Sequence, residues 1–329
     1  MGITTKEIAK ICGVSRGTVD RALNGKGRIS PTTKEKILSV AKEMGYRKDL
    51  LARGLVKGKT MFIGVVVFDI RNHYFSQMVN AIELQARAND YFVNISLHEK
   101  NQEMEYQLVN SLVDRRVDGI LICPVNKGQN FAKFLKRLPI PVVVIGNFVA
   151  PELPFVGIDE KQATEDAMSL LLSKGYERII FVCPPLSDRG MENVYTHEQR
   201  ALGFIEFSKK YQNLEFIIIS TWSYLKELDI LLKKKGKKTA VFCSGDIYAL
   251  QILLHFKKIG IRVPDEIGIM GFDQIDMLEF VTPSLATISN EIEQVGRCAV
   301  NMLVDLMNER QTDTHILIPH KVLDGESIR

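Results

Sequence analysis

The sequence predicts a small all-α head followed by an α/β body that consists of two doubly wound, parallel-sheet halves. Two observations predict this fold class. Residues 1–48 contain three short helical patterns with clear start and stop signals. From residue 61 onward, apolar β-branched runs alternate with helical patterns in two successive series, which is typical of parallel sheets covered by helices.

Charge divides the chain in the same place. Residues 1–60 hold 14 Lys and Arg against 5 Asp and Glu, a net charge of +9, whereas the remainder carries −5. A basic end on a weakly acidic body indicates a polyanion-binding head. Lys6, Glu7 and Lys10 interrupt any early apolar stretch, and no apolar run approaches the length of a bilayer span. We therefore expect a cytoplasmic protein without a membrane partner.

The head begins with a helix whose start is marked by a capping box, Thr4 and Glu7, and whose end is marked by Gly13. Ser15 caps a second helix that runs to Asn24. A third helix follows Ser30-Pro31, with an apolar face of Ile37, Leu38, Val40, Ala41 and Met44. A tight turn between two short helices predicts a helix-turn-helix unit, and the alternative is another three-helix packing module.

The second helix points polar residues outward. Arginine suits a guanine edge or a phosphate, and serine and threonine hydroxyls suit phosphate oxygens. The predicted DNA contacts of the head are Thr5, Ser15, Arg16, Gly17, Thr18, Arg21 and Asn24.

Residues 4–25, TTKEIAKICGVSRGTVDRALNG, and residues 44–60, MGYRKDLLARGLVKGKT, closely resemble the head of the LacI/GalR bacterial transcriptional regulators. The resemblance continues along nearly the whole chain. It implies a homodimer, with a tetramer as an alternative, that binds a pseudo-palindromic operator in double-stranded DNA with the second helix in the major groove. It also implies association with the bacterial nucleoid when the protein is bound to DNA.

The resemblance assigns residues 49–60 to a hinge and linker, in which Leu51–Lys57 folds into a helix only on the operator. Leu55 would enter the minor groove and bend the duplex, while Arg53 and Lys57 hold flanking phosphates. The alternative is a plain linker with Leu55 packed internally. Two residues depart from the family pattern: Asp20 replaces a small hydroxyl residue near phosphate, and Gly17 has no side chain for base reading. Arg16 and Arg21 then carry more of the base recognition.

The body has strand patterns at 62–68, 91–97, 118–123, 141–145, 178–183, 215–219, 239–243 and 266–270. Ligands of such sheets bind beyond the carboxyl ends of the strands. The candidates are therefore the residues that follow each strand, at 69–75, 146–147, 187–200, 222, 245–246 and 273.

The body resembles the effector domain of the same family, which is similar to periplasmic sugar-binding proteins. This resemblance implies the effector contacts Asn72, Tyr74, Phe75, Asn147, Asp159, Thr196, Arg200, Trp222, Asp246 and Asp273. An acid, an arginine and an aromatic face suit a sugar. Gly245-Asp246 and Gly146-Asn147 depart from frequent family pairs, so a nucleobase or nucleoside stays an alternative effector. Arg200 paired with Asp159 or Asp246, Trp222 in the core, and Asp273 as a backbone cap are the structural alternatives.

Chain crossovers divide the body. We assign residues 61–157 and 287–312 to its N-terminal half, and residues 158–286 and 313–329 to its C-terminal half. The helix at 291–308 then belongs to the first half, and a last strand at 315–323 returns to the second.

The residues indicate neither enzymatic nor metal chemistry. The histidines are scattered, the cysteines form no C-x-x-C pair, and neither a nucleophile–base–acid set nor a phosphate or dinucleotide loop is present, so we expect no cofactor. The remaining hypotheses are a ligand-gated repressor, an uptake-type binding protein, an enzyme of the doubly wound class, and a binding protein with a degenerate DNA head. The absent signal peptide and the basic head argue against the second.

Overall fold

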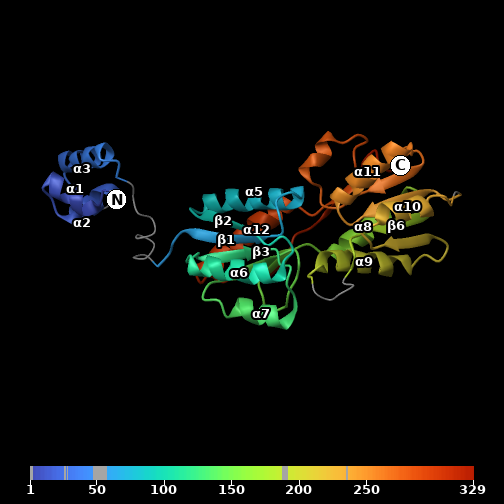
Figure 1. The fold of residues 1–329 in the computed structure, drawn as a ribbon, viewed down its shortest axis with the longest axis horizontal. Coiled ribbons are helices and arrows are strands. Elements are labelled where there is room, and N and C mark those ends of the chain that lie inside the picture. Colours follow the sequence, from blue (N-terminus) through green and yellow to red (C-terminus); the bar gives the residue numbers. More distant parts are fainter. Residues whose placement is uncertain (1–2, 26, 28, 47–57, 187–191, 235) are drawn as a thin grey trace. The chain divides into compact units, whose positions relative to one another are not determined.

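A computed structural model describes residues 3–25, 27, 29–46, 58–186, 192–234 and 236–329. The chain separates into two compact units, residues 1–60 and 61–329 (Figure 1). Each unit is described by itself below.

The head consists of α1 (Thr5–Cys12), α2 (Arg16–Asn24) and α3 (Pro31–Glu43). The predicted capping signals are confirmed. The Thr4 hydroxyl accepts from the Glu7 backbone N–H at 3.3 Å, and the Glu7 carboxylate accepts from the Thr4 backbone N–H at 2.7 Å. Gly13 ends α1 at φ +70°, a left-handed conformation that glycine adopts at little cost.

A single apolar cluster holds the three helices together. Its buried residues are Ile8, Ala9, Cys12, Val19, Ala22, Ile37 and Ala41. Two members of the predicted α3 face are not part of it: Leu38 is 42% exposed and Met44 is 48% exposed. The prediction for these two is wrong because the head is small, and α3 covers only a narrow stripe of α1 and α2.

The first half of the body is built on a six-stranded parallel sheet in the order β11-β5-β4-β3-β1-β2. Its strands are β1 (Phe62–Val67), β2 (Phe92–Leu97), β3 (Gly119–Ile122), β4 (Val142–Ile145), β5 (Phe155–Gly157) and β11 (His315–Leu317). Helices α5 (His73–Ala88) and α12 (Ile292–Met307) pack together, while α6 (Gln102–Asp114) and α7 (Gly128–Lys136) bury a separate apolar cluster against the sheet.

The second half has a four-stranded parallel sheet in the order β7-β6-β8-β9. Its strands are β6 (Arg178–Val182), β7 (Glu215–Ile219), β8 (Thr239–Cys243) and β9 (Ile267–Met270). Helices α8 (Glu160–Ser173) and α9 (Tyr195–Ser208) pack together, and α10 (Tyr224–Leu231) and α11 (Asp246–Ile259) form a second layer (Figure 1). A short 3-10 helix, η1 (Asp276–Phe280), follows β9.

Three connections join the halves, and one of them corrects a prediction. Residues 315–323 are not a single strand that returns to the second half. Instead β11 pairs with β5 in the first sheet, and β12 (Lys321–Leu323) pairs antiparallel with β10 (Thr287–Ser289). Pro319 separates β11 from β12, and a proline has no backbone N–H to continue a ladder.

One apolar cluster runs through both halves. It includes Met78 and Ile82 of α5, Ala299 of α12, Ala167 of α8 and Phe204 of α9. The halves are therefore linked by packed side chains as well as by three chain crossings. No helix among the described residues combines the length and the apolar character that a membrane span requires.

Candidate functional site

The outer surface of α2 carries the polar residues that the sequence assigns to DNA. Ser15, Arg16, Gly17 and Arg21 are exposed, and Thr18 is half-buried. Ser15 caps the helix by accepting from the Thr18 backbone N–H at 3.2 Å. The hydroxyls of Ser15 and Thr18 lie 2.9 Å apart. The start of α2 therefore presents two hydroxyls beside a helix N-terminus, a combination that suits a phosphate.

The two arginines of α2 are oriented by local hydrogen bonds. Arg16 donates through Nε to the Thr5 hydroxyl at 3.2 Å, so α1 and α2 contribute to one surface. Arg21 donates through Nε to the Gly17 carbonyl at 3.2 Å and through Nη2 to the Thr18 hydroxyl at 3.4 Å. In both arginines, part of the guanidinium fork stays available to an external acceptor.

Asp20 has a partner within its own helix. Its carboxylate accepts from the side-chain amide of Asn24 at 2.9 Å, one helical turn on. The Asp20 carboxylate therefore has a hydrogen-bond partner of its own, and that partner, Asn24, is one of the predicted DNA contacts. The predicted hinge contacts Arg53 and Leu55 lie outside the described residues.

The body contains a cavity of about 190 Å³ between its two halves. Eight of the ten predicted effector contacts line it: Asn72, Tyr74, Phe75, Asn147, Thr196, Arg200, Trp222 and Asp273. They come from the loops and helix starts that follow β1, β4, β6, β7 and β9. The carboxyl-end rule for parallel sheets thus brings these residues together, and their role in binding stays a prediction.

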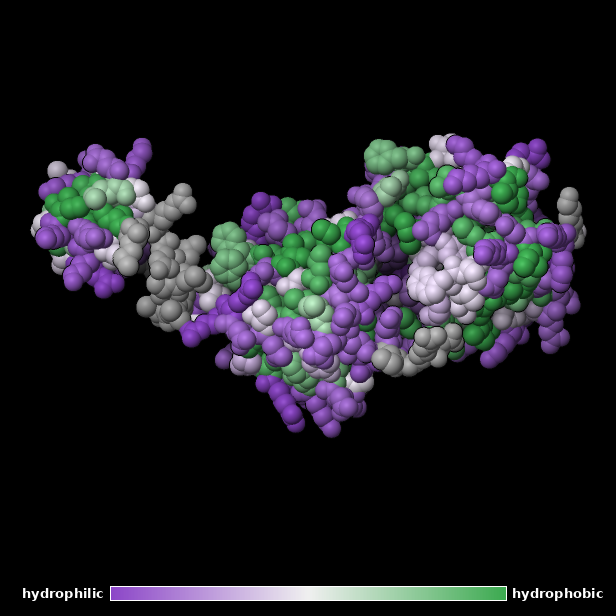
Figure 2. Space-filling view, viewed as in Figure 1, coloured by the Kyte–Doolittle hydropathy of each residue, from purple (hydrophilic) through white to green (hydrophobic). Residues whose placement is uncertain are grey.

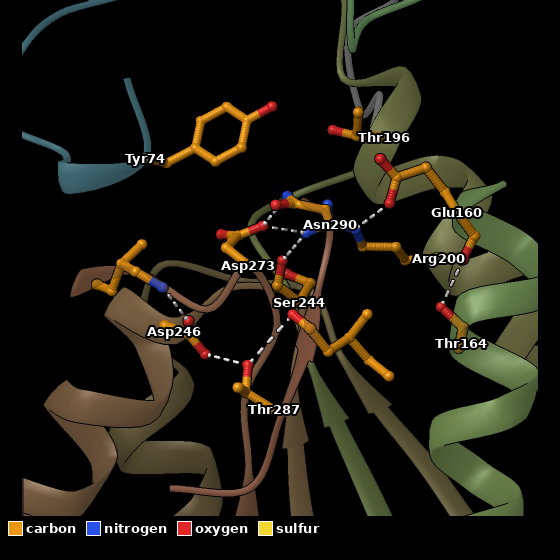
Figure 3. A network of polar contacts seen from close by, with 12 residues as sticks. Tyr74, Glu160, Thr164, Thr196, Arg200, Ser244, Asp246, Asp273, Thr287 and Asn290 are labelled. Atoms are coloured by element: carbon orange, nitrogen blue, oxygen red, sulfur yellow. Dashed lines mark hydrogen bonds and ion pairs between the residues drawn. The ribbon is translucent and has the colours of Figure 1, made fainter. Parts of the chain in front are cut away.

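Arg200 is the centre of a buried charge cluster (Figure 3). It is 4% exposed, and its Nε donates to Glu160 at 2.7 Å. Its Nη1 donates to the Ser244 carbonyl at 2.5 Å and to Asp273 at 3.3 Å. The guanidinium also lies over the ring of Phe272, 3.6 Å from the centroid. If Arg200 had only a structural role, we expected it to pair with Asp159 or Asp246. Its partners in the structure are instead Glu160 and Asp273.

Burial controls the protonation of this site. It raises the pKa of Asp273 to about 7, because Arg200 only partly offsets the loss of water and Glu160 adds a like charge. Burial and the nearby Arg200 lower the pKa of His197 to about 3, so this histidine is neutral at physiological pH. Its Nδ1 is buried and has no partner among the described residues. The cavity therefore offers a neutral imidazole and a carboxyl group that titrates near neutrality.

Two predicted effector contacts do not line the cavity. Asp246 is fully buried and accepts from the Thr287 hydroxyl at 2.7 Å and from the Ile275 backbone N–H at 3.0 Å. Both carboxylate oxygens of Asp246 are thus bonded within the protein. The bond from Ile275 holds the segment that carries Asp273. Asp159 is exposed and caps α8 through the Gln162 backbone N–H at 2.9 Å, so its side chain points away from the site.

Asn147 and Thr196 bond to each other across the two halves. The side-chain oxygen Oδ1 of Asn147 accepts from the backbone N–H and from the hydroxyl of Thr196, both at 3.2 Å. The Asn147 amide donates to the Asn193 carbonyl at 3.0 Å and to the Pro124 carbonyl at 3.2 Å. Asn193 in turn donates its amide to the carbonyls of Asn126 and Phe148, both at 3.1 Å. We call Asn147, Asn193 and Thr196 the interhalf latch.

Sequence reasoning missed several residues of the site. Lys100 and Tyr248 line the cavity, and Glu160 stands directly behind Arg200. Trp222 lies at the rim, 66% exposed, with the Lys100 ammonium 5.5 Å from its ring centroid. The carboxyl-end rule does not select Glu160, which starts a helix that follows a crossover. It could have found Lys100, which is three residues beyond β2, but the loop after that strand was not among the candidates. Within the described ranges, no group of His, Cys, Asp and Glu is arranged to hold a metal ion.

Two family models match this chain. Bacterial regulatory proteins of the lacI family match residues 4–49, and a periplasmic binding protein-like domain matches residues 168–328. Catabolite control protein A of Priestia megaterium is 29% identical over 330 residues, which cover 98% of each chain.

Solved structures of two regulators have the same fold. The lac repressor dimer bound to operator and the anti-inducer ONPF aligns with a TM-score of 0.86 at 22% identity, covering 99% of each chain. The transcriptional regulator CelR in complex with cellobiose aligns with a TM-score of 0.69 at 21% identity, again over 99% of each chain. The chain therefore joins a helix-turn-helix domain of the lacI family to a periplasmic binding protein-like domain, and over its full length it is homologous to catabolite control protein A.

Proposed function

We propose that the protein is a cytoplasmic, ligand-responsive transcriptional repressor that binds a pseudo-palindromic operator as a dimer, with a sugar or sugar derivative as its effector. One observation carries this proposal: the same chain joins a helix-turn-helix head, whose second helix exposes Arg16 and Arg21, to a body that encloses a polar cavity around Arg200 and Asp273.

The head supports DNA binding through charge and geometry. Its reading helix is capped by Ser15, and its two arginines keep part of their donor groups free for bases or phosphates. The basic charge of residues 1–60 supplies the non-specific attraction to the duplex. Gly17 leaves room for close approach, because an added Cβ would meet only the Ser15 hydroxyl at 3.8 Å.

An apolar surface on the first half supports the dimer. Leu84 of α5 is 50% exposed, and Phe92 and Ile95 of the edge strand β2 are 56% and 45% exposed. Figure 2 shows apolar side chains gathered over α5. An uncovered sheet edge beside apolar side chains favours association with a second copy of the chain. Sedimentation distinguishes a dimer from the alternative tetramer.

The cavity supports a small polar effector. Asp273, Asn72 and His197 offer acceptors and donors for hydroxyl groups, while Tyr74 and Phe75 offer apolar faces. Sugars are also the ligands of related folds, since CelR is in complex with cellobiose. A nucleobase or nucleoside is the second candidate effector, because the Trp222 ring at the rim is 66% exposed and suits stacking on a planar ligand.

The mechanism follows from the placement of the cavity between the halves. An effector that binds one arrangement of the halves better than another shifts their equilibrium, and the first half continues directly into the hinge of residues 49–60. By linkage, operator and effector change each other's affinity by the same factor, and a coupling of about 1–3 kcal/mol corresponds to roughly 5–150-fold.

Fluorescence anisotropy with genomic fragments tests the DNA arm. We expect palindrome-specific binding that Arg16→Ala or Arg21→Ala weakens, and that Leu55→Ala weakens far more for operator than for random DNA. Salt-sensitive binding without sequence preference would refute the repressor. A thermal-shift screen of sugars, sugar phosphates and nucleobases tests the effector arm, with Trp222→Ala as the variant that loses the response while it keeps DNA binding.

A further inference from the structure

The hydrogen bonds of Arg200 leave little of its charge for a ligand. Nε and Nη1 are already bonded inside the protein, to Glu160 on one side and to Ser244 and Asp273 on the other (Figure 3). The ring of Phe272 covers one face of the guanidinium. Within the described part of the chain, Nη2 is the terminal nitrogen of Arg200 that makes no hydrogen bond. Arg200 can therefore donate a hydrogen bond to a ligand, but its positive charge is already paired with carboxylates of the protein.

The charges of the cluster do not add to a positive site. Glu160 is 7% exposed and lies behind the arginine, and Asp273 lies in front of it on the cavity wall. With Asp273 ionised the three side chains carry −1, and with Asp273 protonated they carry zero. Glu192 and Asp69 add further acids to the lining, against Lys100. Arg200, Glu160 and Asp273 have side-chain exposures of 5%, 7% and 14%, so these two carboxylates repel an anion near Arg200 more strongly than surface charges would.

The free polar groups of the cavity point to the same ligand class. One Asp273 oxygen bonds to Arg200 and to Asn290, and the described residues provide no partner for the other. An ionised carboxylate only accepts hydrogen bonds, so it selects a ligand group that donates. The ring of His197, which burial keeps neutral, lines the same cavity and adds no positive charge to it. Hydroxyl groups both donate and accept, whereas a phosphate dianion cannot donate.

We propose that Glu160 sets the charge selectivity of the cavity: by neutralising Arg200 from behind, it makes the site accept an uncharged, polyhydroxylated ligand and reject the phosphorylated or carboxylated derivatives of that ligand. This inference rests on the cavity being the effector site of the proposed regulator. Glu160 does not line the cavity, so it acts as a positioning residue through Arg200. The competing explanation is a purely structural tie between α8 and α9.

Sulfate is a suitable probe because it is a dianion throughout the pH range of the protein. We expect isothermal titration calorimetry of the full-length wild type to show no saturable sulfate binding up to about 10 mM, because Glu160 and Asp273 offset the charge of Arg200. Glu160→Gln should gain one saturable site, and Glu160→Gln combined with Arg200→Gln should lose it again. Glu160→Asp keeps the charge and should resemble the wild type.

Three results would overturn the inference. Sulfate binding by the wild type that Arg200→Gln abolishes would show an accessible cation. A folded Glu160→Gln variant without sulfate binding would reduce Glu160 to a structural tie, as would a gain of binding that persists in the double variant. If Glu160→Gln fails to fold by circular dichroism, Asp273→Asn removes the other carboxylate and is expected to gain the same site.

Matched sugars separate this inference from the proposed function. For any neutral sugar that stabilises the wild type, we expect the phosphorylated counterpart to bind at least about 10-fold more weakly, and we expect Glu160→Gln to narrow that ratio. A phosphorylated sugar that binds the wild type more tightly than its neutral form refutes the charge selectivity and leaves the regulator intact. If no sugar binds, the proposed effector class fails, and the sulfate titration still decides the role of Glu160.

Discussion

Replacing Asn193 by alanine tests whether the interhalf latch holds the body in the observed arrangement. Asn193 is 2% exposed, and its amide donates to Asn126 and Phe148 of the first half, both at 3.1 Å. Its side-chain oxygen accepts from the Tyr195 backbone N–H at 3.2 Å. Alanine removes all three of these bonds and keeps the backbone bond to Val125 at 2.7 Å.

The expected loss follows from the number of bonds. Each buried hydrogen bond contributes about 1 kcal/mol to the net free energy of unfolding, so Asn193→Ala is expected to cost about 3 kcal/mol. For a body of this size, 1 kcal/mol lowers the melting temperature by about 2–4 °C, which gives a drop of about 6–12 °C. Because two of the bonds join the halves, the radius of gyration in small-angle scattering should also rise.

Scanning calorimetry and scattering measure the two effects. Asn213→Ala is the matched control, because Asn213 is exposed and none of the hydrogen bonds described for the chain involves its side chain. A melting temperature for Asn193→Ala within about 2 °C of this control, with an unchanged radius of gyration, would contradict the reasoning. A loss of stability without a change in size would mean that Asn193 supports the fold of its loop but does not join the halves.

Three further predictions concern packing, assembly and pH. Gly203→Ala should lower the free energy of unfolding in urea by about 1–3 kcal/mol, because its Cβ would lie 2.6 Å from the Lys161 carbonyl of α8, and an unchanged midpoint would argue against this contact. Leu84→Glu should shift sedimentation from dimer to monomer, whereas Leu254→Glu, equally exposed on α11, should not. Asp273 has a raised pKa of about 7 in the folded chain, so its stabilising contribution is complete below about pH 4 and is lost as pH rises through 7. Asp273→Asn should therefore flatten the fall in melting temperature between pH 4 and pH 7, and an unchanged slope would contradict the assignment.

The fold was largely predictable because its signals are local. The eight strand patterns between residues 62 and 270 are confirmed within one residue, whereas the short strands β5 and β10 were not predicted. The caps of the head follow from single residues such as Thr4 and Ser15. Residues 315–323 were harder, because an apolar run that a proline divides does not indicate which sheet each part joins. That choice depends on partners far away in sequence, Phe155–Gly157 for β11 and Thr287–Ser289 for β12.

The candidate site was predictable in its location and less so in its bonding. Position after a strand selects the cavity wall, but it does not reveal which polar groups satisfy one another. Asp246 follows β8 as expected, yet both of its oxygens bond within the protein. Asp159 and Glu160 are neighbours, and only the helical turn that begins between them decides that Glu160 faces Arg200 while Asp159 faces solvent.

The interhalf latch changes what an effector must do. Asn147 and Thr196, expected to contact a ligand, satisfy each other across the cavity, so the halves meet through bonds of the protein itself. A ligand shifts the arrangement only by its difference in affinity between states. An effector that displaces Thr196 from Asn147 must first replace two hydrogen bonds, about 2 kcal/mol, before it contributes any net shift. Hydroxyl groups that donate and accept at once meet this requirement, which is a second physical reason, independent of the Arg200 cluster, for a polyhydroxylated effector.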